Sequence, residues 1–118
     1  NLVVTAGKGF VASRMIGTSS GVMTHMAVGT GTTDPAAGDT ALETQVGSRK
    51  AFTTSASVSG AVVTYVCAFS AGEGTGALTE AGIFNASSSG TMLCRTEFNV
   101  VNKGASDSMT ITWTVTVS

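Results

Sequence analysis

The chain has 118 residues, which is the size of one domain and too short for two. Charged residues make up 11% of it, against about 25% in an ordinary domain, whereas Thr and Ser together supply 33 residues. The net charge is −1, which argues against a nucleic-acid-binding protein because that function needs a clustered basic patch. No apolar run reaches the roughly 18 residues that predict a membrane span. We therefore expect a single Thr-rich domain, residues 1–118, that binds neither nucleic acid nor membrane.

The chain begins with an apolar segment, Leu2, Val3 and Val4, which lacks the pattern of a secretory signal peptide. A chain end rarely buries three such residues by itself. Residues 1–5 are therefore a candidate attachment arm, whose apolar side chains contact a partner while the arm adds a strand to an exposed sheet edge. The alternative is that this segment is the first strand of the chain's own sheet.

A short helix is expected next, because apolar and basic residues at helical spacing precede a glycine stop: Phe10, Val11, Arg14 and Met15, then Gly17. An apolar set then predicts a strand through His25, namely Met23, Met26 and Val28. Residues 29–38 form a loop rich in Gly, Thr and Ala that holds the single proline of the chain.

A first hairpin is predicted where residues 52–58 and 61–69 flank Ser59-Gly60. A two-residue loop at this point sets Val58 opposite Ala61. One face of the hairpin then carries Phe52, Val58, Val63, Tyr65, Cys67 and Phe69.

A second hairpin is predicted from residues 77–84 and 91–101, which close symmetrically around residues 85–90. This closure sets Glu80 opposite Arg95, and an opposite-charge cross-strand pair adds about 0.2–1 kcal/mol. We therefore expect a structural ion pair on one face of the hairpin. The symmetric closure also sets Ile83 opposite Met92 and Ala81 opposite Cys94, and these four residues fall on the other face.

The C-terminal stretch alternates strictly between apolar residues and hydroxyls, with Met109, Ile111, Trp113, Val115 and Val117 as its apolar members. This period of two predicts a strand inside a sheet, with Trp113 as a core anchor. Several short strands with turn signals in one small unit predict an all-β fold. We expect an antiparallel β-sandwich or flattened barrel with a short N-terminal helix.

The residues that carry chemistry in enzymes are sparse in this sequence. His25 is the single histidine, and its neighbours provide no catalytic triad. Glu73 and Glu80 could suggest paired carboxylates, but Glu73 lies in a glycine loop and Glu80 has a predicted partner. Phosphate-binding and dinucleotide-binding glycine motifs are incomplete. We therefore expect no catalytic residues, no cofactor and no enzyme activity.

The two cysteines, Cys67 and Cys94, stand 27 residues apart with no CxxC pair, which argues against a zinc site and leaves no predicted metal site. We expect two buried thiols, because free cysteine is among the most buried residue types. A disulfide is the alternative if the two side chains face each other across the core.

Two groups of residues in this sequence resemble a pattern found in small virion proteins of tailed bacteriophages. The first is residues 26–33, MAVGTGTT, followed by residues 38–42, GDTAL. The second is residues 78–85, LTEAGIFN, followed by residues 90–93, GTML, and it is completed by residues 107–115, DSMTITWTV. The Glu-Ala-Gly-Ile-Phe element within the second group also looks like one in phage tail-fibre proteins.

The resemblance implies a structural protein of the phage particle, made in the host cytoplasm and assembled with other virion proteins, and a homo-oligomer. One role that the resemblance implies is that of a capsid decoration or cement protein, which binds the lattice of the major capsid protein. The short chain favours this role, because fibre proteins add long shafts. The alternative is a tail, neck or head-fibre component that attaches fibres or contacts a host receptor. A carbohydrate-binding module is a third and weaker reading, because the pattern places no aromatic ring on the surface.

Overall fold

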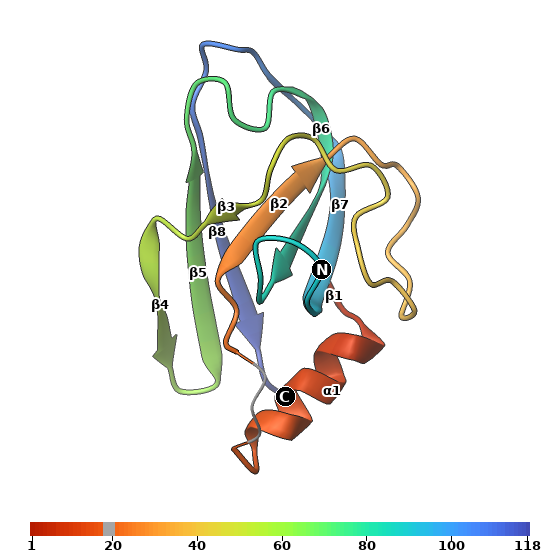
Figure 1. Cartoon of the computed structure of the whole chain (residues 1–118), viewed down its shortest axis with the longest axis vertical. Helices are drawn as coiled ribbons and strands as arrows, with labels where there is room; N and C mark the ends of the chain where they lie inside the picture. Colours follow the sequence, from red (N-terminus) through yellow and green to blue (C-terminus); the bar gives the residue numbers. More distant parts are fainter. Residues whose placement is uncertain (18–20) are drawn as a thin grey trace.

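The computed structural model describes residues 1–17 and 21–118, which form two antiparallel sheets and one helix (Figure 1). The five-stranded sheet has the order β1 (Leu2–Val3), β7 (Met92–Lys103), β6 (Gly76–Phe84), β2 (His25–Gly29) and β3 (Lys50–Ala51). The three-stranded sheet has the order β4 (Thr54–Ser59), β5 (Val62–Phe69) and β8 (Met109–Thr116). The helix α1 spans Thr5–Arg14. The fold is the all-β sandwich with a short N-terminal helix that the strand pattern predicts.

The main core lies between the two sheets, where alternate residues of each strand point inward. Trp113 on β8 is 6% exposed and belongs to this core, as its place in the alternating pattern predicts. The five-stranded sheet supplies most of the opposing side chains, and the buried members of the cluster include Met26, Val28, Leu78, Ala81, Ile83 and Cys94.

The outer face of the five-stranded sheet is also covered. The segment between β2 and β3 lies over this face, on the side away from the three-stranded sheet (Figure 1). Beneath it is a second apolar cluster of Val4, Ala27, Leu42, Phe84 and Met92. Leu42 comes from the covering segment, so this loop contributes to a core of its own and the molecule has three layers.

The helix α1 begins at Thr5, earlier than the apolar residues alone predict, and Gly17 ends the following turn with φ +70°. It packs against β7 through Gly7, because a Cβ at this position would overlap the backbone carbonyl of Leu93. The close approach explains why the helix carries a glycine on its buried side.

The first hairpin has the predicted strands but a different loop. Its two-residue turn is Gly60-Ala61, and β4 and β5 pair Ser59 with Val62 and Val58 with Val63. The predicted pairing of Val58 with Ala61 is therefore wrong by two residues on the second strand. Gly60 has φ +59° and stands at the first central position, which is where a type II′ turn requires glycine. The predicted loop would place Ser59 there.

The second hairpin also has the predicted strands with a shifted register. Ile83 pairs with Cys94 and not with Met92, and the residue directly opposite Glu80 is Glu97. Irregularities on both sides of this stretch, at Leu78/Glu80 and at Ile83/Phe84, break the symmetric closure that we expected. Met92 consequently faces the outer cluster, whereas Ala81, Ile83 and Cys94 keep their predicted place in the main core.

The strand β8 lies at the edge of its sheet and not inside it, which corrects the prediction from its regular alternation. It pairs with β5 over eight consecutive residues, and no other strand of the described residues pairs with it. A hydroxyl face and an apolar face are as compatible with an edge strand as with a central one, so the alternation alone does not distinguish the two.

Candidate functional site

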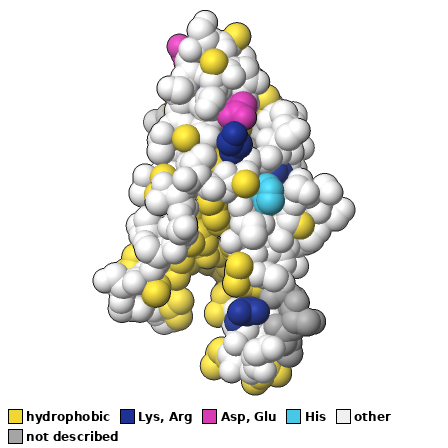
Figure 2. Space-filling model, turned by 60° about the vertical axis from the view of Figure 1, so that its left-hand side comes forward, with side chains coloured by type: hydrophobic (Ala, Val, Ile, Leu, Met, Phe, Trp, Pro, Cys, Tyr) yellow, Lys and Arg dark blue, Asp and Glu magenta, His cyan; other side chains and the backbone are white. Residues whose placement is uncertain are grey.

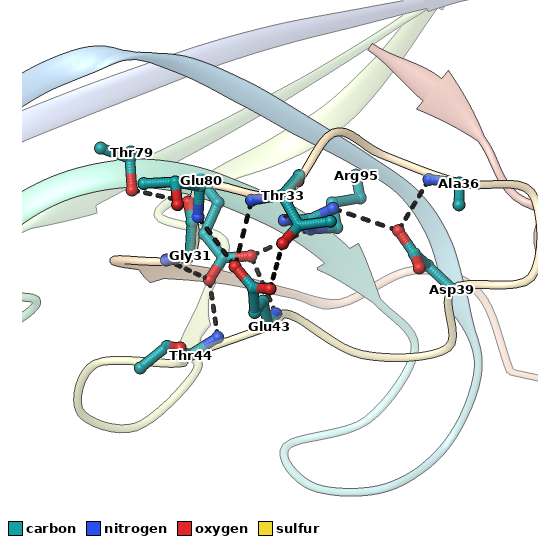
Figure 3. A network of polar contacts seen from close by, with 10 residues as sticks. Gly31, Thr33, Ala36, Asp39, Glu43, Thr44, Thr79, Glu80 and Arg95 are labelled. Atoms are coloured by element: carbon teal, nitrogen blue, oxygen red, sulfur yellow. Dashed lines mark hydrogen bonds and ion pairs between the residues drawn. The ribbon is translucent and has the colours of Figure 1, made fainter.

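The densest polar arrangement of the structure surrounds the carboxylate of Glu80, which β6 carries on the outer face of the sheet (Figure 3). Its side chain is fully buried. Oε1 accepts hydrogen bonds from Arg95 Nε and the Glu43 N–H, each at 2.9 Å. Oε2 accepts from the N–H groups of Gly31 and Thr44, each at 2.8 Å. Four protein donors therefore satisfy this carboxylate.

Arg95 reaches Glu80 from the neighbouring strand β7 and is 2% exposed. The predicted ion pair of Glu80 and Arg95 is thus confirmed, although it lies in the protein interior. The guanidinium also donates from Nη1 to Asp39 at 3.1 Å and from Nη2 to the carbonyl of Thr33 at 2.9 Å. Both of these acceptors belong to the segment between β2 and β3.

A second carboxylate, that of Glu43, forms hydrogen bonds within the segment between β2 and β3, at the protein surface. Its Oε1 accepts from the N–H groups of Thr32 at 2.8 Å and Thr33 at 3.1 Å, and its Oε2 accepts from the Thr33 hydroxyl. Asp39 Oδ2 accepts from the Ala36 N–H at 2.9 Å. The loop therefore has an internal set of hydrogen bonds, and Glu80 and Arg95 connect it to the sheet.

Two opposing effects act on the pKa of Glu80. Burial raises it, but the hydrogen bonds from the backbone of Thr44 and Glu43, from Arg95 and from Gly31 together lower it below its ordinary value. Burial lowers the pKa of Arg95, and its contacts with Glu80 and Asp39 raise it above the ordinary value. Hydrogen bonds from Thr33 and Thr32 lower the pKa of Glu43. The network therefore holds its groups in their charged forms.

The glycines of the Gly-Thr-Gly stretch are required by this geometry. A Cβ at Gly31 would overlap Glu80 Oε2 and the side chain of Glu43, and a Cβ at Gly29 would overlap the carbonyl of Thr44. Close backbone approach to a buried carboxylate is thus the physical reason for this motif, which superficially suggests a phosphate-binding loop.

We call the network of Glu80, Arg95, Glu43 and Asp39 the clip, because it holds the loop between β2 and β3 against the sheet. Each carboxylate oxygen of Glu80 accepts two hydrogen bonds from the protein. No buried side-chain nitrogen or oxygen of the described residues lacks a hydrogen-bond partner. The stretches that carry the resemblance, residues 26–33, 38–42 and 78–85, meet at this clip (Figure 3).

The N-terminal segment takes the second of the two arrangements that the sequence leaves open. Leu2 pairs with Arg95 and Val3 with Cys94, so the segment is the first strand of the chain's own sheet. Val4 is fully buried in the outer cluster and is not available to a partner, which corrects its place among the candidate contacts. Leu2 and Val3 are half-buried, and their contact with a partner stays a prediction.

The remaining chemically notable residues lie apart from the clip. His25 opens β2, and its Nδ1 is 2.7 Å from the hydroxyl oxygen of the adjacent Thr24. Cys67 and Cys94 are buried and free, as expected for two thiols of the core. Burial raises the pKa of Cys67 to about 11 and that of Cys94 to about 12.

An apolar end of the molecule was not anticipated from the sequence. Figure 2 shows hydrophobic side chains gathered in a hollow between two lobes at the lower end of that view. Hollows of about 300 Å³ open there between the β4–β5 hairpin and the segment before β2, and between α1 and β8. Six exposed hydrophobic residues of the described chain lie on elements at this end: Val11, Met15, Ile16, Val22, Val58 and Val117. Met15 and Ile16 are 82% and 81% exposed.

The part of this end that sequence reasoning could have found is the helix terminus. Met15 is one of the residues that predict the helix, and Ile16 follows it directly before Gly17. The convergence of the other residues depends on the tertiary fold.

Within the described residues, no cluster of three or more His, Cys, Asp or Glu side chains could hold a metal ion. The one helix of this part of the chain is too short and too polar to cross a bilayer. No protein-family model matches the chain, and no curated protein matches it.

Proposed function

We propose that this chain is a non-enzymatic structural protein of a bacteriophage virion that seats its apolar end on other virion proteins. The observation that carries the proposal is the exposed apolar end, formed by elements distant in the sequence. Exposed apolar surfaces of this kind mark protein–protein contact sites. The resemblance of residues 26–33, 38–42, 78–85 and 90–93 to small virion proteins supports the choice of partner.

The lattice of the major capsid protein is the partner that we favour, which makes the chain a decoration or cement protein. Within residues 1–118 there is no repeated segment of the kind that builds a fibre shaft, which supports decoration. The Glu-Ala-Gly-Ile-Phe element, residues 80–84, does not argue for the tail-fibre alternative. All five of its residues are buried in this chain, so here the element specifies the fold and cannot contact a host receptor.

Quantitative mass spectrometry of purified phage particles tests where in the particle the chain is located. A copy number that matches the number of capsid protein subunits, or of their clusters, supports decoration. A few copies per particle support the tail, neck or head-fibre alternative. The absence of the chain from the particles contradicts the whole proposal.

The role of the apolar end is tested with a matched pair of variants supplied to assembling particles. Met15→Lys places a charge on the apolar end, and we expect it to abolish incorporation while the fold is kept. Val100→Lys adds the same charge at an exposed valine of β7, and we expect it to leave incorporation unchanged. Equal incorporation of the two variants contradicts the proposed contact.

A further inference from the structure

The outer edge of β8 is a regular sheet edge that pairs with no other strand of the described residues. Its eight residues pair with β5 in an unbroken register. The other free edges are interrupted, short or charged. The strand β4 has an irregularity between Thr54 and Ser57, β1 and β3 have two residues each, and β7 carries Glu97 and Lys103 beyond its pairing with β1. Proteins usually protect an edge with charges, proline, bulges or short strands. The sequence of β8, MTITWTVT, contains none of these.

The threonines of β8 carry the unpaired backbone groups. Val117 donates its N–H to the carbonyl of Ala61 at 2.8 Å, in the same register as the pairing of β5 and β8. Hydrogen-bonded and non-hydrogen-bonded pairs alternate in an antiparallel ladder. The odd-numbered residues therefore bond to β5, and Thr110, Thr112, Thr114 and Thr116 direct N–H and C=O away from it.

One contact shows that these groups accept a donor from outside the sheet. Asn1 donates from Nδ2 to the carbonyl of Thr114 at 3.3 Å. The side-chain amide occupies this part of the edge and leaves Thr110 and Thr112 open. Both have exposed side chains, so a second strand can approach them.

Beside this edge runs an apolar groove of about 550 Å³ between β7 and β8. It is lined by the inward side chains Met109, Ile111 and Trp113 of β8 and by Phe98 and Val101 of β7. No charged side chain lines it. A strand that continues the sheet past β8 would point its own alternate residues into this groove, and those residues must be apolar.

We propose that β8 pairs antiparallel with β8 of a second copy of this chain, which makes one continuous six-stranded sheet from two three-stranded ones. A partner strand needs free backbone N–H and C=O groups along one edge and apolar side chains on the groove side. The strand β8 itself has both, since its threonines carry the free backbone groups and its alternate residues are apolar. It carries no charge, so two copies do not repel each other along the strand. Two-fold symmetry makes such a contact self-complementary.

Thr110 and Thr112, which Asn1 leaves open, determine the register between the two β8 strands. Thr110 of one copy exchanges hydrogen bonds with Thr112 of the other, and the two Ile111 residues face each other at the symmetry axis. Met109 then lies opposite Trp113 of the second copy, on the groove side. This pairing stands independently of the virion proposal, because it requires no other protein.

The mass of the purified chain in solution, measured by light scattering over a range of concentrations, is the first test. We expect two chains per particle. A chain that stays monomeric throughout, or a particle of another stoichiometry, overturns the proposal.

Charge variants test the edge and its register. Thr110→Lys combined with Thr112→Lys places like charges opposite each other at both ends of the pairing, and we expect a monomer. Thr110→Glu combined with Thr112→Lys sets opposite charges in the same places, and we expect the dimer to return. Ser55→Lys combined with Ser57→Lys adds the same charge to the exposed strand β4 and should leave the dimer unchanged.

Circular dichroism shows for each variant whether the fold persists, and the solvent-exposed position of all four residues predicts that it does. A folded Lys–Lys variant of β8 that remains dimeric overturns the proposed edge. Failure of the Glu–Lys variant to restore a dimer overturns the proposed register.

Discussion

Glu80 and Arg95 form their ion pair diagonally across β6 and β7, because the residues directly opposite them are Glu97 and Gly82. The diagonal leaves both side chains on the outer face of the sheet, where the loop between β2 and β3 covers them. The sheet supplies one charge of each sign, and the loop supplies backbone donors and acceptors for both. Neither element could bury its part of the network without the other.

Glu80→Ala is expected to lower the free energy of unfolding by about 3–5 kcal/mol, because it leaves the guanidinium of Arg95 buried without its main partner. Denaturation by urea at neutral pH measures the change. Glu97→Ala is the matched control, since Glu97 is only partly buried and forms no ion pair within the described residues. It should change the stability by no more than about 0.5 kcal/mol. Equal losses in the two variants would show that the clip does not stabilise the fold.

The stability should also fall in acid because of Glu80. Its pKa in the folded protein is below the ordinary value, whereas in the unfolded chain it is about 4.3. The carboxylate therefore stabilises the fold fully above the unfolded pKa, and this contribution is lost as the pH falls through the folded pKa. Urea denaturation at a series of acidic pH values measures the slope.

Glu80→Gln provides the control for this pH dependence. The variant should be less stable at neutral pH and should lose stability less steeply in acid. Glu43 and Glu73 also have a lowered pKa, so some dependence remains. Parallel curves for the parent and the variant would assign the acid sensitivity to other groups.

The two cysteines should be unreactive in the folded protein. Burial raises their pKa values well above neutral pH, so the reactive thiolate is scarce and reagents cannot reach it. We expect iodoacetamide to modify both thiols in denaturant and neither in buffer, with the intact mass as the measurement. Identical masses of the denatured, alkylated chain with and without prior reduction are also expected. A quantitative disulfide would contradict the free thiols at Cys67 and Cys94.

The sequence predicts the strands better than their pairing. Alternation of apolar and polar residues identifies β5 and β8, because the period of two follows directly from strand geometry. Register depends on where a single residue bulges or turns. The glycine requirement of the turn at Gly60 and the irregularity at Ile83/Phe84 each move a strand by one or two positions, and neither leaves a mark on the alternation.

The clip was predictable only as a pair of charges. Opposite signs on two neighbouring strands identify Glu80 and Arg95, since no better partners are near in the sequence. The burial of the pair depends on backbone groups of Gly31, Glu43 and Thr44, and a backbone N–H carries no sequence signature. The two glycines of the Gly-Thr-Gly stretch are the sequence signal for the close approach of this backbone to Glu80 and Thr44. The same glycines are equally typical of a turn.

Trp113→Ala should lower the free energy of unfolding by about 3–5 kcal/mol, because it leaves a large cavity between the sheets. Thermal unfolding followed by circular dichroism measures the effect. Thr116→Ala on the same strand changes an exposed side chain and should alter the melting temperature little. Parent-like melting of the Trp113 variant would place the indole on the surface and make it a candidate binding residue.

Gly7 and Gly9 should respond in opposite directions to the same substitution. Both lie within α1, but a Cβ at Gly7 would overlap the backbone carbonyl of Leu93, whereas a Cβ at Gly9 would meet nothing within 4 Å. Gly7→Ala must therefore push the helix away from β7, and overpacking of this kind costs about 1–3 kcal/mol. Gly9→Ala removes backbone freedom from the unfolded chain without a steric penalty and should stabilise the fold by up to about 1 kcal/mol.

Each kcal/mol corresponds to a shift of about 4 °C in the melting temperature of a domain of this size. The expected result is a lower melting temperature for Gly7→Ala and a slightly higher one for Gly9→Ala. Because the two variants share the helix, the residue exchanged and the added methyl group, helix propensity alone predicts the same sign for both. Equal shifts would show that α1 does not pack against β7 through Gly7.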